Sequence, residues 1–331
     1  MSTVLVLGGT AWLSAEVARQ AVAAGHDVTC LARGSGSFPA GVSELRADRT
    51  APDAYGGVRG GAFDLIVDVA QQPGQVRSAL ASLGSIGAHW VFVSTGSVYA
   101  DSDHLSGDES DPLLAAAEDD IVTDEQYGAG KVACENAFAD VDVPVSILRA
   151  GLIGGPGDGS DRLGYWPAAF ARAVRPGGVD LPVLVPDVTE QPVQVVDVRD
   201  IAAFSLTAGL ARAAGVFDVT GIPSTLGEMV ELSRSAAGHR GEVVTVGVEK
   251  LVEAGVQYWA RPGSLPLWLP PGHALATMRP SAAAAAAGFT RRPLIDTIRD
   301  TLADERERGV DRDRRSGLSR VREDELLAAF G

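Results

Sequence analysis

The chain has 331 residues, of which 46% are apolar, and a formal net charge of −15. Its length allows a main domain with a smaller lobe. The acidic balance argues against a nucleic acid partner, because binding a polyanion requires clustered cations. No apolar run approaches the roughly 20 residues of a membrane span, and a strand begins at the N-terminus without a basic leader. These features predict a cytoplasmic protein that contacts no membrane. Cys30, Cys134 and the five histidines lack metal-ligand spacing, which predicts buried thiols and no metal site.

The N-terminus carries a pattern typical of phosphate binding. An aliphatic run, residues 4–7, stops at Gly8, and a helical pattern of apolar residues follows over 13–22. In such a strand, turn and helix, unpaired N–H groups and the helix dipole can hold a pyrophosphate. The dinucleotide fingerprint expects three glycines, where this chain has Gly8, Ala11 and Ser14. The alternative is a glycine turn that only connects two elements.

A second strand is predicted over residues 27–31, and Arg33 follows it. This is where the adenosine ribose of a dinucleotide lies. An acidic residue there accepts bonds from a free 2′-hydroxyl, whereas an arginine favours a 2′-phosphate. The pattern therefore favours NADP(H), with NAD(H) as the alternative cofactor. Arg33 could equally be a solvated surface residue.

Further strands alternate with helices along the first two thirds of the chain. They are predicted at 44–48, 63–70, 90–93 and 215–220, with helices at 73–83 and from 197 onward. This alternation predicts an α/β fold, a doubly wound parallel Rossmann sheet with a smaller C-terminal substrate lobe. The ligand crevice of such a sheet lies beyond the carboxyl ends of its strands, where Ser94 and Thr95 fall.

An acidic loop over residues 101–124 is expected to form a rim or lid, and a helix with a reactive pair follows it. Tyr127 and Lys131 lie four residues apart, so both side chains share one helix face. With five tyrosines and only two lysines in the chain, this spacing would arise by chance roughly one time in thirty. A neighbouring ammonium favours the phenolate and so lowers the pKa of a tyrosine toward neutrality. The pair therefore predicts a general acid or base.

Taken together, these motifs resemble the short-chain dehydrogenase/reductase superfamily, in its extended or atypical branch of NAD-dependent epimerase/dehydratase-like proteins. The resemblance covers about the first 160 residues and is carried by residues 8–14, 48, 68–70, 94–99, 127, 131 and 148–157.

The resemblance implies roles for particular residues. Tyr127 would be the catalytic acid or base, Lys131 its activator and a ribose ligand, and Thr95 the residue that binds the substrate oxygen. The cofactor would be bound by Gly8, Thr10, Ala11, Trp12, Leu13, Arg33, Asp48, Ala70, Ser94, Tyr127 and Lys131. Asp48 would meet the adenine amino group. Ala11 and Ser14 depart from the family's glycines, which argues against tight nucleotide binding.

The expected domains are a dinucleotide-binding domain over 1–155, completed by about 191–220, and a substrate lobe over 156–190 and 221–331. In the lobe, aromatic residues either wall an apolar pocket or form the core; they are Tyr165, Trp166, Tyr258, Trp259 and Trp268. Three arginines, Arg162, Arg172 and Arg175, are candidates for binding phosphates.

The predicted function is an NAD(P)-dependent oxidoreductase that transfers hydride between nicotinamide and a small organic carbonyl or alcohol. One alternative is a sugar-nucleotide epimerase or dehydratase of the same superfamily. Another is a non-enzymatic nucleotide-sensing regulator, and a methyltransferase explains the tyrosine and lysine less well. The sequence leaves the oligomeric state open. The resemblance implies that a homodimer could form through the helix that carries Tyr127 and Lys131, whose small residues Gly128, Ala129 and Ala133 allow close helix contact but also suit internal packing.

Overall fold

The computed structural model describes residues 1–34, 36–100, 107–273 and 278–331. The chain divides into two compact units. Unit 1 consists of residues 1–151, 198–220 and 279–290, and unit 2 of residues 152–197, 221–278 and 291–331. The expected domain limits differ from these units at residues 152–155, 191–197 and 279–290.

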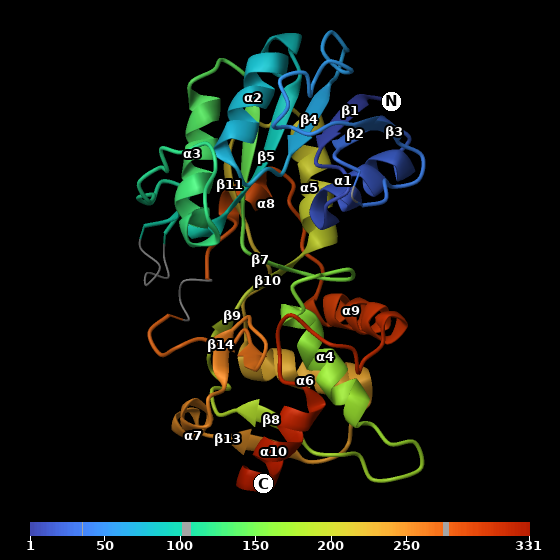
Figure 1. Cartoon of the computed structure of the whole chain (residues 1–331), viewed down its shortest axis with the longest axis vertical. Helices are drawn as coiled ribbons and strands as arrows, with labels where there is room; N and C mark the ends of the chain where they lie inside the picture. Colours follow the sequence, from blue (N-terminus) through green and yellow to red (C-terminus); the bar gives the residue numbers. More distant parts are fainter. Residues whose placement is uncertain (35, 101–106, 274–277) are drawn as a thin grey trace. The chain divides into compact units, whose positions relative to one another are not determined.

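Unit 1 is built on a seven-stranded sheet in the order β11-β6-β5-β4-β1-β2-β3 (Figure 1). All neighbouring strands are parallel. The strands are β1 Thr3–Leu7, β2 Asp27–Ala32, β3 Ser43–Arg46, β4 Leu65–Asp68, β5 His89–Thr95, β6 Val145–Ala150 and β11 Gly215–Val219. The predicted α/β fold with a doubly wound parallel sheet is confirmed. The third strand ends at Arg46, two residues before Asp48, so Asp48 lies in the loop beyond the sheet.

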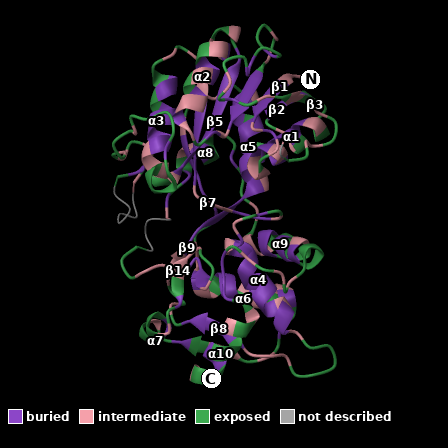
Figure 2. Ribbon diagram, in the orientation of Figure 1, coloured by how far each residue is buried: buried purple, intermediate pink, exposed green. Residues whose placement is uncertain are grey.

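Helices cover both faces of this sheet. The helices α1 Trp12–Ala23 and α5 Val198–Leu210 pack together on one face, and α2 Pro73–Leu83 and α3 Tyr127–Ala139 on the other (Figure 1). Short 3-10 turns η1 Gly84–Ile86, η2 Gly96–Val98 and η3 Asp124–Gln126 adjoin them. The central strands β1, β4 and β5 are almost wholly buried, as parallel strands covered on both faces must be (Figure 2).

Residues 279–290 return to the sheet of unit 1 after a long passage through unit 2. The Thr220 N–H donates to Ser281 Oγ at 3.1 Å, and the Thr220 hydroxyl donates to the Arg279 carbonyl at 2.8 Å. The ring of Phe289 lies 5.3 Å from that of Phe204 on α5. These contacts, and the helix α8 Ala282–Ala286 beside β11, explain why an alanine-rich segment belongs with the dinucleotide-binding sheet.

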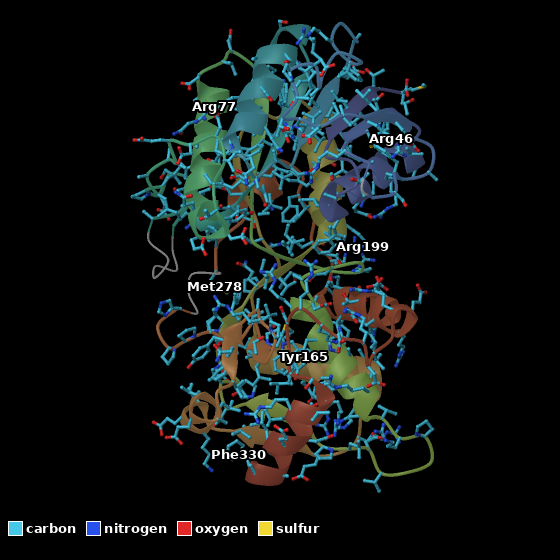
Figure 3. All side chains as sticks on the ribbon, viewed as in Figure 1. Arg46, Arg77, Tyr165, Arg199, Met278 and Phe330 are labelled. Carbon is cyan, nitrogen blue, oxygen red and sulfur yellow. The ribbon has the colours of Figure 1, made fainter. Side chains whose placement is uncertain are left out.

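Unit 2 combines helices with two-stranded sheets. Its helices are α4 Arg162–Ala173, α6 Leu226–Ala237, α7 Val248–Glu253, α9 Leu294–Arg308 and α10 Arg320–Phe330. The paired strands are β7 Leu152–Gly154 with β10 Val195–Asp197, β8 Val183–Pro186 with β13 Val243–Val246, β9 Pro192–Val193 with β12 Ser224–Thr225, and β14 Gln257–Trp259 with β15 Ser264–Pro266. Tyr165, which is labelled in Figure 3, is completely buried in the core of unit 2, as are Trp166 and Trp268.

The three arginines proposed as phosphate ligands have partners inside unit 2. Arg172 Nη2 lies 2.7 Å from the buried carboxylate of Glu323. Arg175 Nη1 donates to the carbonyls of Arg172 and Val174. The guanidinium of Arg162 lies over the ring of Trp259, 5.4 Å from its centroid. Arg172 is therefore a structural residue rather than a phosphate ligand.

Among the described residues, no helix combines the length and apolar character that crossing a membrane requires. Within the same part of the chain, no group of three or more His, Cys, Asp or Glu side chains could hold a metal ion. Cys30 and Cys134 are free and buried, as predicted.

Candidate active site

The turn after β1 depends on its two glycines. Gly8 has a φ of +84°, a conformation that costs glycine little, and its N–H donates to the Leu31 carbonyl at 2.7 Å. A Cβ atom at Gly9 would lie 2.5 Å from the Cβ of Cys30. The second glycine therefore lets the turn lie directly on β2, and the helix α1 starts at Trp12 just beyond it.

The two residues that depart from the glycine fingerprint lie in different environments. Ser14 is completely buried, and its hydroxyl donates to the Gly8 carbonyl at 2.5 Å and to the Ala11 carbonyl at 3.2 Å. Ser14 thus closes the turn from within the protein. Ala11 is exposed and lines a cavity beside the turn. The weaker nucleotide binding expected from these two departures stays a prediction.

This cavity, of about 320 Å³, lies at the carboxyl ends of β1, β2 and β4. It falls within the usual size range of small-molecule sites. Its lining residues are Leu7, Gly8, Thr10, Ala11, Leu31, Ala32, Arg33, Ala47, Asp48, Arg49, Val69, Ala70, Gln71, Gln72 and Gln75. Six of them are predicted cofactor ligands: Gly8, Thr10, Ala11, Arg33, Asp48 and Ala70. The other five predicted ligands, Trp12, Leu13, Ser94, Tyr127 and Lys131, are outside this lining.

The part of the cavity beyond β2 and β3 carries both a cation and an anion. Arg33 and Asp48 are exposed on its rim. The N–H and hydroxyl of Thr50 donate to Asp48 at 3.0 and 2.8 Å, and these bonds, with the nearby Arg33, hold the pKa of this carboxyl below its usual value. Asp48 is therefore a carboxylate at neutral pH, which offers an acceptor beside the arginine. Arg46 lies at the end of β3 (Figure 3). Its guanidinium donates to the carboxylate of Glu44.

Sequence reasoning missed Arg49. Its buried guanidinium lines the cavity and makes two hydrogen bonds of 2.7 Å to Asp68 at the end of β4. Burial by itself lowers the pKa of Arg49, but the charge of Asp68 and the bonds to it outweigh that effect, so the pKa lies above its usual value. The sequence indicated only that Asp68 is an acidic residue at the end of the fourth strand. No local pattern predicts that two residues 19 positions apart will form an ion pair.

Lys131 reaches the wall of the cavity from α3. Its ammonium donates to the carbonyls of Ala70, at 2.8 Å, and Val93, at 2.6 Å, and lies 4.5 Å from the ring centroid of Phe92. The side chain is 2% exposed, and burial lowers its pKa to about 8. The amine is thus still mostly an ammonium at neutral pH and loses its proton at about pH 8, within the working range of an acid–base group.

The other predicted catalytic residues lie on elements adjoining Lys131. Tyr127 is half-buried at the start of α3, one turn before Lys131. Thr95 ends β5, and its hydroxyl accepts the N–H of Ser97 at 3.2 Å, which caps η2. Ser94 instead donates to the buried carboxylate of Glu135 at 2.5 Å, so its hydroxyl is engaged inside the protein. A cofactor contact by Ser94 stays a prediction.

Close packing inside the protein explains the two glycines of α3. A Cβ atom at Gly128 would collide with the carbonyl oxygen of Ser97, and one at Gly130 would lie 2.6 Å from a methyl carbon of Val122. Internal packing therefore accounts for these two small residues. A homodimer through this helix stays a prediction.

The described part of the acidic loop is tied to the sheet. Arg279 bonds to Asp111 at 3.1 Å and to Asp218 at 2.8 Å, while Arg149 donates to the Glu109 carbonyl at 2.8 Å. Both guanidinium groups also lie over the ring of Tyr99, that of Arg279 at 3.4 Å from the ring centroid and that of Arg149 at 4.9 Å. The predicted rim or lid also includes residues 101–106, which lie outside the described residues.

Burial of Lys131 predicts a specific dependence of stability on pH. Because its pKa is lowered from 10.5 to about 8, the unfolded chain binds more protons than the folded one between these values. The stability that this group contributes therefore rises with pH across that window. We expect the gap in free energy of unfolding between the unaltered protein and Lys131→Met to change by about 2 kcal/mol between about pH 8 and 9.5. Urea unfolding at both pH values measures this, and a constant gap would contradict it.

The comparisons with solved structures show the fold. A protein from Burkholderia cenocepacia J2315 described as a candidate epimerase is 21% identical, with a TM-score of 0.70 over 92% of this chain and 98% of that one. The UDP-glucose 4-epimerase of Thermus thermophilus, in complex with NAD, is 17% identical, with a TM-score of 0.66 over 92% and 99%. The UDP-N-acetylglucosamine 4-epimerase of Bacillus cereus is 15% identical, with a TM-score of 0.66 over 92% and 99%.

No curated protein sequence matches the chain. A family model does, and its match spans the strands and helices that build the cavity, the Tyr127 helix and β11. The description of that model is the NAD dependent epimerase/dehydratase family, and it covers residues 4–219. This chain therefore belongs to the NAD dependent epimerase/dehydratase family.

Proposed function

We propose that this protein binds a nicotinamide dinucleotide in the cavity beside Gly8 and catalyses hydride transfer at a carbon that bears a hydroxyl or carbonyl oxygen. The observation that carries the proposal is the bond from Lys131 Nζ to the carbonyl of Ala70, a residue of the cavity wall. It joins the tyrosine and lysine helix to the nucleotide cavity. When bound, the nicotinamide would accept or supply the hydride.

The residues of this chain fit such a cofactor. The start of α1, which has no side-chain cap, presents backbone N–H groups suited to a pyrophosphate, and Asp48 offers an acceptor to the adenosine part. Lys131 would bind the ribose and favour the phenolate of Tyr127. Tyr127 would exchange a proton with the substrate oxygen, which Thr95 would orient by a hydrogen bond.

For the substrate, we favour a sugar nucleotide over a simple carbonyl compound. Support comes from the family and from solved structures of similar fold, which include MoeE5 in complex with UDP-glucose and NAD and the NDP-hexosamine 5,6-dehydratase TunA. In such a reaction Tyr127 would first act as a base toward the sugar hydroxyl and later return the proton. A reductase for a small carbonyl compound is the second candidate, because a separate cavity in unit 2 has an apolar wall that includes Trp268, Leu269 and Pro270.

The first test is a titration of the apoprotein with NADH and with NADPH, followed by nicotinamide fluorescence and repeated on Arg33→Ala. If Arg33 binds a 2′-phosphate, NADPH should bind at least about tenfold more tightly, equivalent to about 1.4 kcal/mol, and the substitution should remove the difference. Equal affinity, or tighter binding of NADH, would mean that Arg33 binds no 2′-phosphate and that Asp48 is the residue that binds the adenosine part.

A protein that binds neither nucleotide would refute the proposed function. Binding without turnover of any sugar nucleotide or carbonyl compound would instead favour the nucleotide-sensing regulator.

A further inference from the structure

A buried ion pair forms part of the wall of the nucleotide cavity. Arg49 and Asp68 are 8% and 0% exposed, and two parallel hydrogen bonds of 2.7 Å join them. The guanidinium also donates to the hydroxyl of Tyr55 and to the carbonyl of Gln75, each at 2.9 Å. Four bonds therefore fix a side chain that faces the cavity, and a bidentate arginine in such a setting has little freedom.

The same pair is linked to Lys131 through one backbone residue. Asp68 Oδ1 accepts the N–H of Ala70 at 2.9 Å, and the carbonyl of Ala70 accepts a bond from Lys131 Nζ at 2.8 Å. A continuous series of bonds thus runs from Arg49, in the cavity wall, to the ammonium of Lys131 on α3. Every member of the series is buried.

The carbonyls of Ala70 and Val93 are the groups that fix the position of the Lys131 ammonium. The ring of Phe92 lies 4.5 Å from the ammonium. The charged or titratable groups that act on its pKa are Cys134, Asp68, Glu135 and Arg49. Glu135 is ion-paired with Arg149 at 2.8 Å, Asp68 is paired with Arg49, and burial raises the pKa of the Cys134 thiol to about 11. Neither carboxylate is left to hold Lys131, so the carbonyls of Ala70 and Val93 set the place of its amine.

We propose that Arg49 and Asp68 are positioning residues, which hold Ala70 and through it the ammonium of Lys131, so that occupancy of the adenosine end of the cavity is coupled to Lys131. The pair touches neither Tyr127 nor the reacting atoms; it acts through the backbone. The coupling is reciprocal: if a bound adenosine group changes the pKa of Lys131, then protonation of Lys131 changes the affinity for the adenosine group by the same factor. The identity of the ligand rests on the proposed function, whereas the hold of the pair on Lys131 does not.

The chain offers a direct readout, because Lys131 and Lys250 are its only lysines. In protein labelled with ¹³C at lysine Cε and carrying Lys250→Arg, a single lysine signal remains, and its pH titration reports Lys131. The test variant is Arg49→Gln/Asp68→Asn, which removes both charges and leaves no buried charge unpaired. The attraction of Asp68 raises the pKa of Lys131 and the repulsion of Arg49 lowers it, with Asp68 the larger effect. We therefore expect the pKa of Lys131 to fall.

The matched control is Arg172→Gln/Glu323→Gln, which makes the same kind of change in an equally buried pair of unit 2. It should leave the titration of Lys131 unchanged, so a general loss of stability cannot imitate the result. A second measurement uses the parent protein with ADP, which lacks the nicotinamide half and would fill only the adenosine and pyrophosphate region. ADP should shift the Lys131 signal, and this measurement remains decisive where the test variant fails to fold.

The proposal is overturned if the Lys131 titration of the test variant equals that of the parent, or if bound ADP leaves the signal unmoved. Either result can occur while a nicotinamide nucleotide still binds and turns over, in which case the proposed function stands. If neither NADH nor NADPH binds the parent protein but the test variant shifts the titration, the proposed function fails and the positioning role stands.

Discussion

Replacing Tyr127 with phenylalanine should lower turnover by about 10²- to 10⁴-fold, because the variant loses the hydroxyl that exchanges a proton with the substrate oxygen. Nucleotide affinity should change little, since the tyrosine lies outside the lining of the described cavity. The loss should therefore appear in kcat rather than in the cofactor dissociation constant. Nicotinamide absorbance during turnover of a sugar nucleotide or carbonyl substrate measures the first, and a fluorescence titration measures the second.

Tyr165→Phe is the matched control, because it also removes one phenolic hydroxyl. Tyr165 is completely buried in the core of unit 2, so its variant should keep the rate of the unaltered protein. A Tyr127→Phe variant that retained turnover within a factor of about two would contradict the acid–base role, since general acid–base catalysis is worth far more than this. Loss of nucleotide binding in Tyr127→Phe would also contradict it, and would mean that the tyrosine supports the cavity.

The sheet could be predicted from the sequence because its strands obey a local rule. Strands covered on both faces read as continuous apolar runs, and those over 4–7, 65–68 and 89–95 are buried almost throughout. The place of Tyr127 and Lys131 on one helix also followed from spacing alone. Patterns of this kind need no knowledge of what packs against what.

Contacts between distant residues could not be predicted in this way. The pairing of Arg49 with Asp68 depends on how the loop after β3 folds over β4, which no periodicity records. Ser14 reads as a defect in the glycine fingerprint, yet its hydroxyl closes the turn through a bond to Gly8. Arg172 reads as a free cation, although its partner Glu323 lies 151 residues away.

A large loss of stability is expected when Glu323, the partner of Arg172, is replaced. Glu323→Ala should lower the free energy of unfolding by about 3–5 kcal/mol, because it leaves the guanidinium of Arg172 buried without its counter-charge. Glu323 is fully buried, its Oε2 lies 2.7 Å from Arg172, and its Oε1 accepts the N–H of Leu184 on β8 at 3.2 Å. One carboxylate thus ties α10 to both α4 and β8, so its loss should loosen the C-terminal helix. Urea unfolding followed by circular dichroism measures the change.

Glu325→Ala provides the comparison within the same helix. Glu325 pairs with Arg322 at 2.7 Å, but both side chains are exposed, at 58% and 40%. Solvent screens such a pair, so this variant should cost at most about 1 kcal/mol. Equal costs for the two variants would mean that helix propensity, not the buried charge pair, dominates. A cost for Glu323→Ala several times larger would instead show that α10 is held by one buried ion pair, since the two substitutions differ mainly in burial.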